Sequence, residues 1–181
     1  MSGKEYVDRV RREQGLLEKI ISYVPGYRGY KEKELRRETD RLVRMEAVNN
    51  LKAAKKAIKR KSAKPSVATN LSSDDIWRFD TLTTRLDRVT QRLDKAVAGY
   101  AGLFDATRVK EDKLDSVIEH DLGLIESSRT LRSEIEAAAK MEPGNEDWRT
   151  TMDRLISLTD ELDSSLDIRT EVLRGIAVKL L

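Results

Sequence analysis

The chain has 181 residues, which is enough for one medium domain or for a small domain with an appendage. It contains no cysteine, which excludes a disulfide framework and Cys-ligated metal sites. Glycine and proline are few and 37% of the residues are charged, a composition that favours long helices. The net charge is +3, but the charges are distributed unevenly. Residues 1–66 carry 19 basic and 9 acidic residues, while the rest of the chain has a negative net charge. We therefore expect two parts with different partners.

The first predicted helix covers about residues 3–22 and ends at Val24-Pro25-Gly26, because proline cannot continue a helix. A tyrosine-rich turn follows it. Tyrosine is enriched at interfaces, so we take this turn as a candidate protein-interaction site. The alternative is that its tyrosines cover the apolar stripe of a helical hairpin. The candidate residues are Tyr23, Tyr27, Arg28 and Tyr30.

The second predicted helix covers about residues 30–62, and at about 1.5 Å per residue it would be about 50 Å long. We expect it to pair with the first helix as a basic hairpin of residues 1–61. Because the first helix is shorter, we expect the basic end of the second to project. Its apolar stripe is formed by Leu35, Leu42, Met45, Val48, Leu51 and Ile58.

Residues 62–73 contain Pro65 and many small polar residues, and we predict that they form a linker. Ser72 or Ser73 is expected to cap the next helix, over about 74–101. From Phe79 to Leu103 its apolar residues recur in alternating steps of three and four. That spacing is the heptad pattern of helix bundles and coiled coils.

Two more helices are predicted, over about 109–140 and from 146 onwards, with Asn145 as the cap of the last. Their short connection predicts that residues 74–181 form an antiparallel three-helix bundle. The predicted fold is therefore all-α, with an N-terminal hairpin (1–61), a linker (62–73) and a coiled-coil-like bundle (74–181).

No constellation of catalytic residues is found in the sequence. His120 is the only histidine, and Val117 stands where a Glu-x-x-His metal motif needs Glu. Neither a nucleophile elbow nor a glycine-rich phosphate loop occurs. We therefore predict no enzyme activity, no metal ligand, no cofactor and no small-molecule substrate.

The strongest surface signal is a run of cations in which no acidic residue lies between Glu46 and Asp74. Such a run can contact RNA or DNA phosphates or anionic lipid headgroups, or it can lie against the acidic half of the chain. No aromatic residue interrupts it, so base stacking is not supported. The candidate anion-binding residues are Lys52, Lys55, Lys56, Lys59, Arg60, Lys61 and Lys64.

Residues 24–44 read Val-Pro-Gly-Tyr-Arg-Gly-Tyr followed by a helix rich in Lys, Glu and Arg. This stretch resembles a signature of a family of uncharacterised prokaryotic helical proteins. The corner from Gly99 to Asp105 is similar to a second segment of that family. The resemblance implies a cytoplasmic helical protein without assigned activity, and it supplies no catalytic residues.

The sequence thus predicts a non-enzymatic interaction or scaffold protein that binds a protein partner or a second copy of itself. The first alternative is a nucleic-acid-binding or ribosome-associated factor that uses the basic segment 52–64. The second is peripheral binding to an anionic membrane surface. No apolar run of about 18 residues and no signal-peptide core occur, so we expect a cytoplasmic location.

Overall fold

The computed structural model describes residues 32–68, 71–95 and 111–174, together with Gly15, Glu18, Lys19, Ser22 and Tyr23. Helices make up nearly all of these residues and no strand occurs among them, which confirms the predicted all-helical class. The helices are α2 (Glu32–Ser62), α3 (Pro65–Ala68), α4 (Ser73–Lys95), α5 (Glu111–Ala138) and α6 (Glu146–Arg174).

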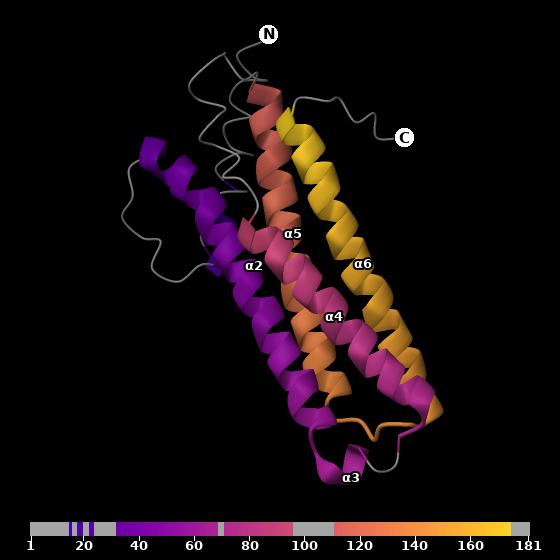
Figure 1. The fold of residues 1–181 in the computed structure, drawn as a ribbon. Helices are drawn as coiled ribbons and strands as arrows, with labels where there is room; N and C mark the ends of the chain where they lie inside the picture. Colours follow the sequence, from indigo (N-terminus) through magenta and orange to yellow (C-terminus); the bar gives the residue numbers. More distant parts are fainter. Residues whose placement is uncertain are drawn as a thin grey trace.

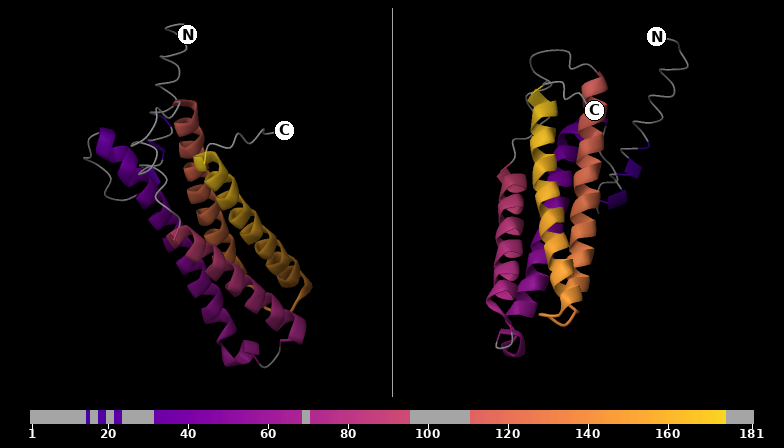
Figure 2. Two further views of the ribbon diagram at one scale, coloured as in Figure 1. Left: turned by 45° about the horizontal axis from the view of Figure 1, so that its top comes forward. Right: turned by 90° about the vertical axis from the view of Figure 1, so that its right-hand side faces the viewer.

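The four long helices pack into one bundle in which successive helices run in opposite directions (Figure 1). Helix α2 lies beside α4 and α5, and α6 lies beside the same two helices. Helices α4 and α5 therefore occupy opposite corners, as the right-hand view of Figure 2 shows. As a result α4 and α6 are parallel neighbours, and so are α2 and α5.

The predicted division into a hairpin and a separate three-helix bundle is not confirmed. Helix α2 belongs to the same hydrophobic core as α4, α5 and α6. The expectation that its basic end projects is wrong, because Ala54 and Ile58 are fully buried and Val67, beyond the helix end, is buried as well. The predicted helix over 3–22 and most of the tyrosine-rich turn lie outside the described residues.

The buried face of α2 combines small and large apolar side chains. Ala47 and Ala54 are fully buried together with three larger residues, Val43, Leu51 and Ile58. Met45, which the sequence placed on the buried stripe, is 47% exposed. The predicted stripe is therefore right at Val48, Leu51 and Ile58, which are buried, and wrong at Met45; the buried alanines of α2 were not part of it.

The heptad pattern of α4 is confirmed as far as the helix is described. Phe79, Leu82, Leu86, Val89 and Leu93 are buried, whereas Ile76, the first apolar residue of the helix, is 45% exposed. The ring centroid of Phe79 lies 5.1 Å from that of Trp148 on α6. On α6, alternating steps of four and three bury Trp148, Met152, Leu155, Thr159, Leu162, Leu166 and Arg169. The buried positions of α4 and α6 thus recur in alternating steps of three and four, with polar residues at two of these α6 positions.

Both predicted helix caps are confirmed. The Ser72 hydroxyl accepts a hydrogen bond from the Asp75 backbone N–H (3.2 Å) and donates one to the Asp75 carboxylate (2.7 Å). At the start of α6 the Asn145 side-chain oxygen accepts a hydrogen bond from the Trp148 N–H at 2.8 Å. Gly144 precedes this cap with φ of +92°, a conformation that favours glycine.

Candidate binding groove

An open groove runs along the seam between α2 and α4. Its central part has a volume of about 710 Å³. A second hollow of about 380 Å³ shares Lys52 and Asp94 with it, and a third of about 240 Å³ shares Lys59. From Ile76 to Asp94, at about 1.5 Å per residue along α4, the groove is about 27 Å long. The three hollows therefore form one elongated surface, which we call the α2–α4 groove.

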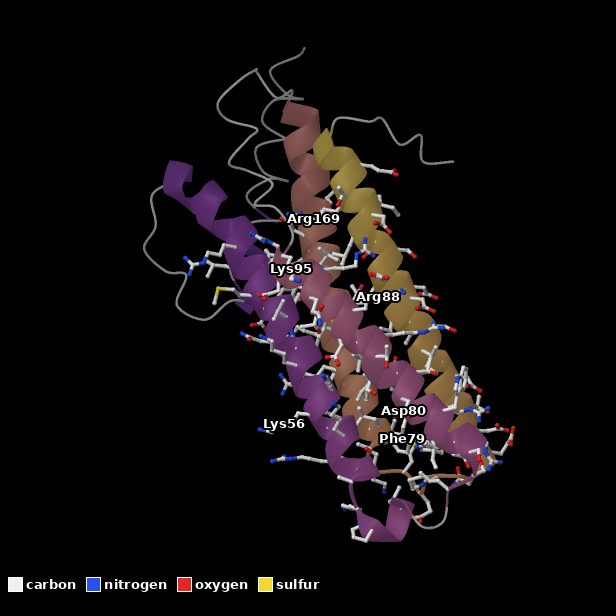
Figure 3. The ribbon with its side chains drawn as sticks, in the orientation of Figure 1. Lys56, Phe79, Asp80, Arg88, Lys95 and Arg169 are labelled. Atoms are coloured by element: carbon white, nitrogen blue, oxygen red, sulfur yellow. The ribbon has the colours of Figure 1, made fainter. Side chains whose placement is uncertain are left out.

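Helix α2 supplies the basic wall of the groove. Five of the seven predicted anion-binding residues line its central part: Lys52, Lys55, Lys56, Lys59 and Arg60. Lys61 is half-buried and Lys64 is exposed in the turn after α2, and neither lines that hollow. Figure 3 shows Lys56 on the outer side of α2. Most of the predicted anion-binding residues, but not all of them, therefore lie on one wall of the groove.

Helix α4 supplies an acidic wall opposite these cations. Asp80, Asp87 and Asp94 line the groove at steps of seven residues. The Lys55 ammonium forms an ion pair with the Asp87 carboxylate across the seam. Asp80 and Asp94 are exposed. This wall was not predicted, although the seven-residue spacing of its aspartates on a heptad helix is a signal in the sequence.

Two exposed apolar side chains lie near the ends of the groove. Met45 lines the hollow next to Lys52 and is 47% exposed. Ile76 lines the hollow next to Lys59 and is 45% exposed. The groove therefore offers apolar contacts at both ends and charged side chains along its walls.

The other side of α4 is joined to α6 by a ladder of ion pairs. Arg78 donates two hydrogen bonds to the Asp153 carboxylate, at 2.9 and 3.2 Å. One heptad further along, Arg85 pairs with Asp160, and after another heptad Arg92 pairs with Asp167. Arg88 also lies on this side of α4 (Figure 3), and it pairs with Asp163. The arginines of α4 are thus engaged by the acidic helix α6 and do not face the groove.

Asp75, at the start of α4, is a buried carboxylate that forms an ion pair with the partly exposed Arg149 on α6. Its carboxylate is 1% exposed and accepts hydrogen bonds from Arg149 Nε at 2.8 Å and Nη2 at 3.0 Å. These bonds hold the pKa of Asp75 well below its usual range, although burial acts in the opposite direction, and bonds from Ser72 lower the pKa further. The pair fastens the beginning of α4 to the beginning of α6.

Polar groups also lie in the interior between the other helices. Asp121 on α5 and Arg169 on α6 form a buried ion pair at 2.6 Å. Asn50 on α2 donates a hydrogen bond to the Ser128 hydroxyl on α5 at 3.4 Å and accepts one from Arg132 at 3.3 Å. Because such groups are costly to bury unpaired, they favour one alignment of the helices over shifted ones.

Of the candidate interaction turn, only Tyr23 lies within the described residues. Its hydroxyl donates a hydrogen bond to Glu126 on α5 at 3.4 Å, and the Arg129 guanidinium lies 4.7 Å from its ring centroid. Lys19 forms an ion pair with the same Glu126 at 2.9 Å. Tyr23 thus contacts the outer side of α5. Tyr27, Arg28 and Tyr30 lie outside the described residues, as does the corner 99–105.

His120 is half-buried on α5, beside the buried Asp121. Within 32–68, 71–95, 111–174 and the five isolated positions, no three His, Asp or Glu side chains gather closely enough to hold a metal ion. None of the helices in these ranges combines the length and apolar character needed to cross a bilayer. Comparison with protein-family models, curated proteins and solved structures finds no match to this chain.

Proposed function

We propose that this protein is a non-enzymatic interaction protein that receives a helix of a protein partner in the α2–α4 groove. The observation that carries the proposal is the form of this groove, which is open, elongated and bounded by two helices. Its length of about 27 Å matches about 18 helical residues. Recognition of an amphipathic helix in a groove between helices is a recurrent mode of protein binding.

The side chains along the groove support a helical partner. Lysine side chains cover apolar surface with their methylene stems while their ammonium groups stay in water. The stems of Lys52, Lys56 and Lys59, with Ala63, therefore provide an apolar lining beneath a charged rim. Met45 and Ile76 extend this apolar character toward the two ends.

A second candidate function is binding of nucleic acid, and the exposed cations of α2 favour it. Lys52, Lys56, Lys59 and Arg60 are all exposed along one side of the helix. Contacts of this kind to phosphates would be non-specific and strongly salt-dependent. An anionic membrane surface would use the same residues.

Photo-crosslinking from a defined position tests the proposal. A benzophenone amino acid replaces Lys56 in the groove and, in a matched control protein, the exposed Ser164 on α6. After irradiation in cells, we expect a protein adduct at position 56 that resists nuclease, is absent at position 164 and is lost when K52E and K59E are added. A nuclease-sensitive adduct at position 56 would favour nucleic acid, and equal adducts at both positions would contradict the proposal.

A further inference from the structure

Helix α4 carries two charge stripes that use the same seven-residue period. Arg78, Arg85 and Arg92 form one stripe, and each pairs with an aspartate of α6. Asp80, Asp87 and Asp94 form the other stripe, on the side of the groove. The groove therefore has a cationic wall on α2 and an anionic wall on α4.

We propose that the α2–α4 groove selects a helix with one acidic edge and one basic edge and holds that helix in one direction. The inference rests on the proposed function and adds the chemistry of the partner. The acidic edge contacts Lys52, Lys56 and Lys59 on α2, and the basic edge contacts Asp80 and Asp94 on α4. The apolar face of the partner lies on the floor of the groove.

The acidic wall makes the groove selective against uniform polyanions. A phosphate backbone or an anionic lipid surface that reaches Lys52 and Lys59 also approaches the carboxylates of Asp94 and Asp80, since each pair lines one shared hollow. Like charges brought together across an interface disfavour the wrong partner. A partner helix with a basic edge turns the same carboxylates into favourable contacts.

The two walls also determine the direction of the bound helix. When the apolar face of a helix lies on the floor, one edge faces α2 and the other faces α4. Turning the helix end for end exchanges the two edges. For a given partner sequence only one direction places acids against lysines and bases against aspartates, so exchange of the edge charges should reverse the bound direction.

Peptide binding to the full-length protein tests this inference. The probes are two 18-residue stapled helices of identical composition, one with an acidic and a basic edge and one with the charges mixed on both edges. We expect fluorescence anisotropy to show at least tenfold tighter binding of the two-edged peptide. K52E with K59E should abolish this preference. D80N with D94N should reduce it at least threefold, and the exposed control pair D147N with E171Q, which has the same charge change, should leave it intact.

A 20-nucleotide single-stranded RNA and phosphatidylserine vesicles serve as polyanionic probes. Both should bind more tightly to the D80N and D94N protein than to the D147N and E171Q control. A benzophenone at the peptide N-terminus should label opposite ends of the groove in the two-edged peptide and its edge-exchanged version. Equal affinity of both peptides, or tighter binding of RNA than of the two-edged peptide, would overturn the inference. The photo-crosslinking experiment at position 56 remains a separate test of the proposed function.

Discussion

Replacing Asp75 with asparagine tests whether the buried carboxylate at the start of α4 stabilises the packing of α4 against α6. The change preserves the size of the side chain and its position next to Ser72. It replaces the charged acceptor of two hydrogen bonds from Arg149, at 2.8 and 3.0 Å, with a neutral amide. The stability of the bundle should therefore report the ion pair and not a loss of volume.

The expected cost follows from the geometry of the pair. A hydrogen bond to a charged group contributes about 1.5–3 kcal/mol to stability. Both bonds come from one partly exposed guanidinium, so we count them as a single interaction. The free energy of unfolding at pH 7 should fall by about 1.5–3 kcal/mol. Asp74→Asn is the matched control, because Asp74 is exposed in the same helical turn, and it should cost less than about 1 kcal/mol.

The pH dependence provides a second measurement. The pKa of Asp75 is lowered in the folded protein, whereas in the unfolded chain it should be near its ordinary value of about 3.9. The stabilisation is then fully present above about pH 4 and is lost as the pH falls toward the folded-state pKa. Urea unfolding followed by circular dichroism should show a constant difference between wild type and Asp75→Asn from pH 7 to 5. A difference below about 0.5 kcal/mol at pH 7, or one that does not shrink below pH 4, would refute the reasoning.

Three other predictions test the packing. Leu51→Ala on the fully buried face of α2 should lower the free energy of unfolding of the whole bundle by about 2–5 kcal/mol in urea titrations, because α2 shares the core. A loss confined to a separate transition would contradict that shared core. Gly144→Ala should cost about 1–2 kcal/mol in thermal unfolding because of the φ of +92°, and an unchanged midpoint would contradict this. Trp77 is 59% exposed and Trp148 is fully buried. Trp77→Phe should therefore shift the tryptophan fluorescence maximum of the protein to shorter wavelength, and Trp148→Phe should shift it to longer wavelength. Shifts in the opposite directions would contradict the fold.

The periodicity of single helices could be predicted from the sequence, but their partners could not. On α4 the steps from Phe79 to Leu93 identify the buried face correctly, because a heptad pattern marks the seam of any bundle. The pattern does not say which helix lies on the other side of that seam. A three-helix bundle of 74–181 places both α5 and α6 beside α4, whereas its neighbours in the structure are α2 and α6.

The sequence pattern predicts the buried Val48, Leu51 and Ile58 of α2 correctly, but not the alanines buried beside them. Alanine is only weakly hydrophobic, so Ala47 and Ala54 do not stand out in an apolar sequence pattern. Their small size nevertheless suits them to a closely packed helix face, and both are fully buried. The basic run of α2 is a surface signal in the sequence, and five of the seven predicted anion-binding residues do line the central part of the groove. The seven-residue spacing of Asp80, Asp87 and Asp94 marks an acidic stripe in the sequence, but only the position of α4 beside α2 makes that stripe a wall of the groove.

The parallel pairing of α2 with α5 has a consequence for synthesis of the chain. Asn50 and its partner Ser128 are separated by 78 residues in sequence. At about 5–20 residues per second, a ribosome needs about 4–16 s to add that stretch. During this interval α4 is already available to α2, because Asp87 follows Lys55 by only 32 residues. Among the four long helices, α4 is therefore the first neighbour that α2 can meet during translation, and the contacts between α2 and α5 can form only after α5 has emerged.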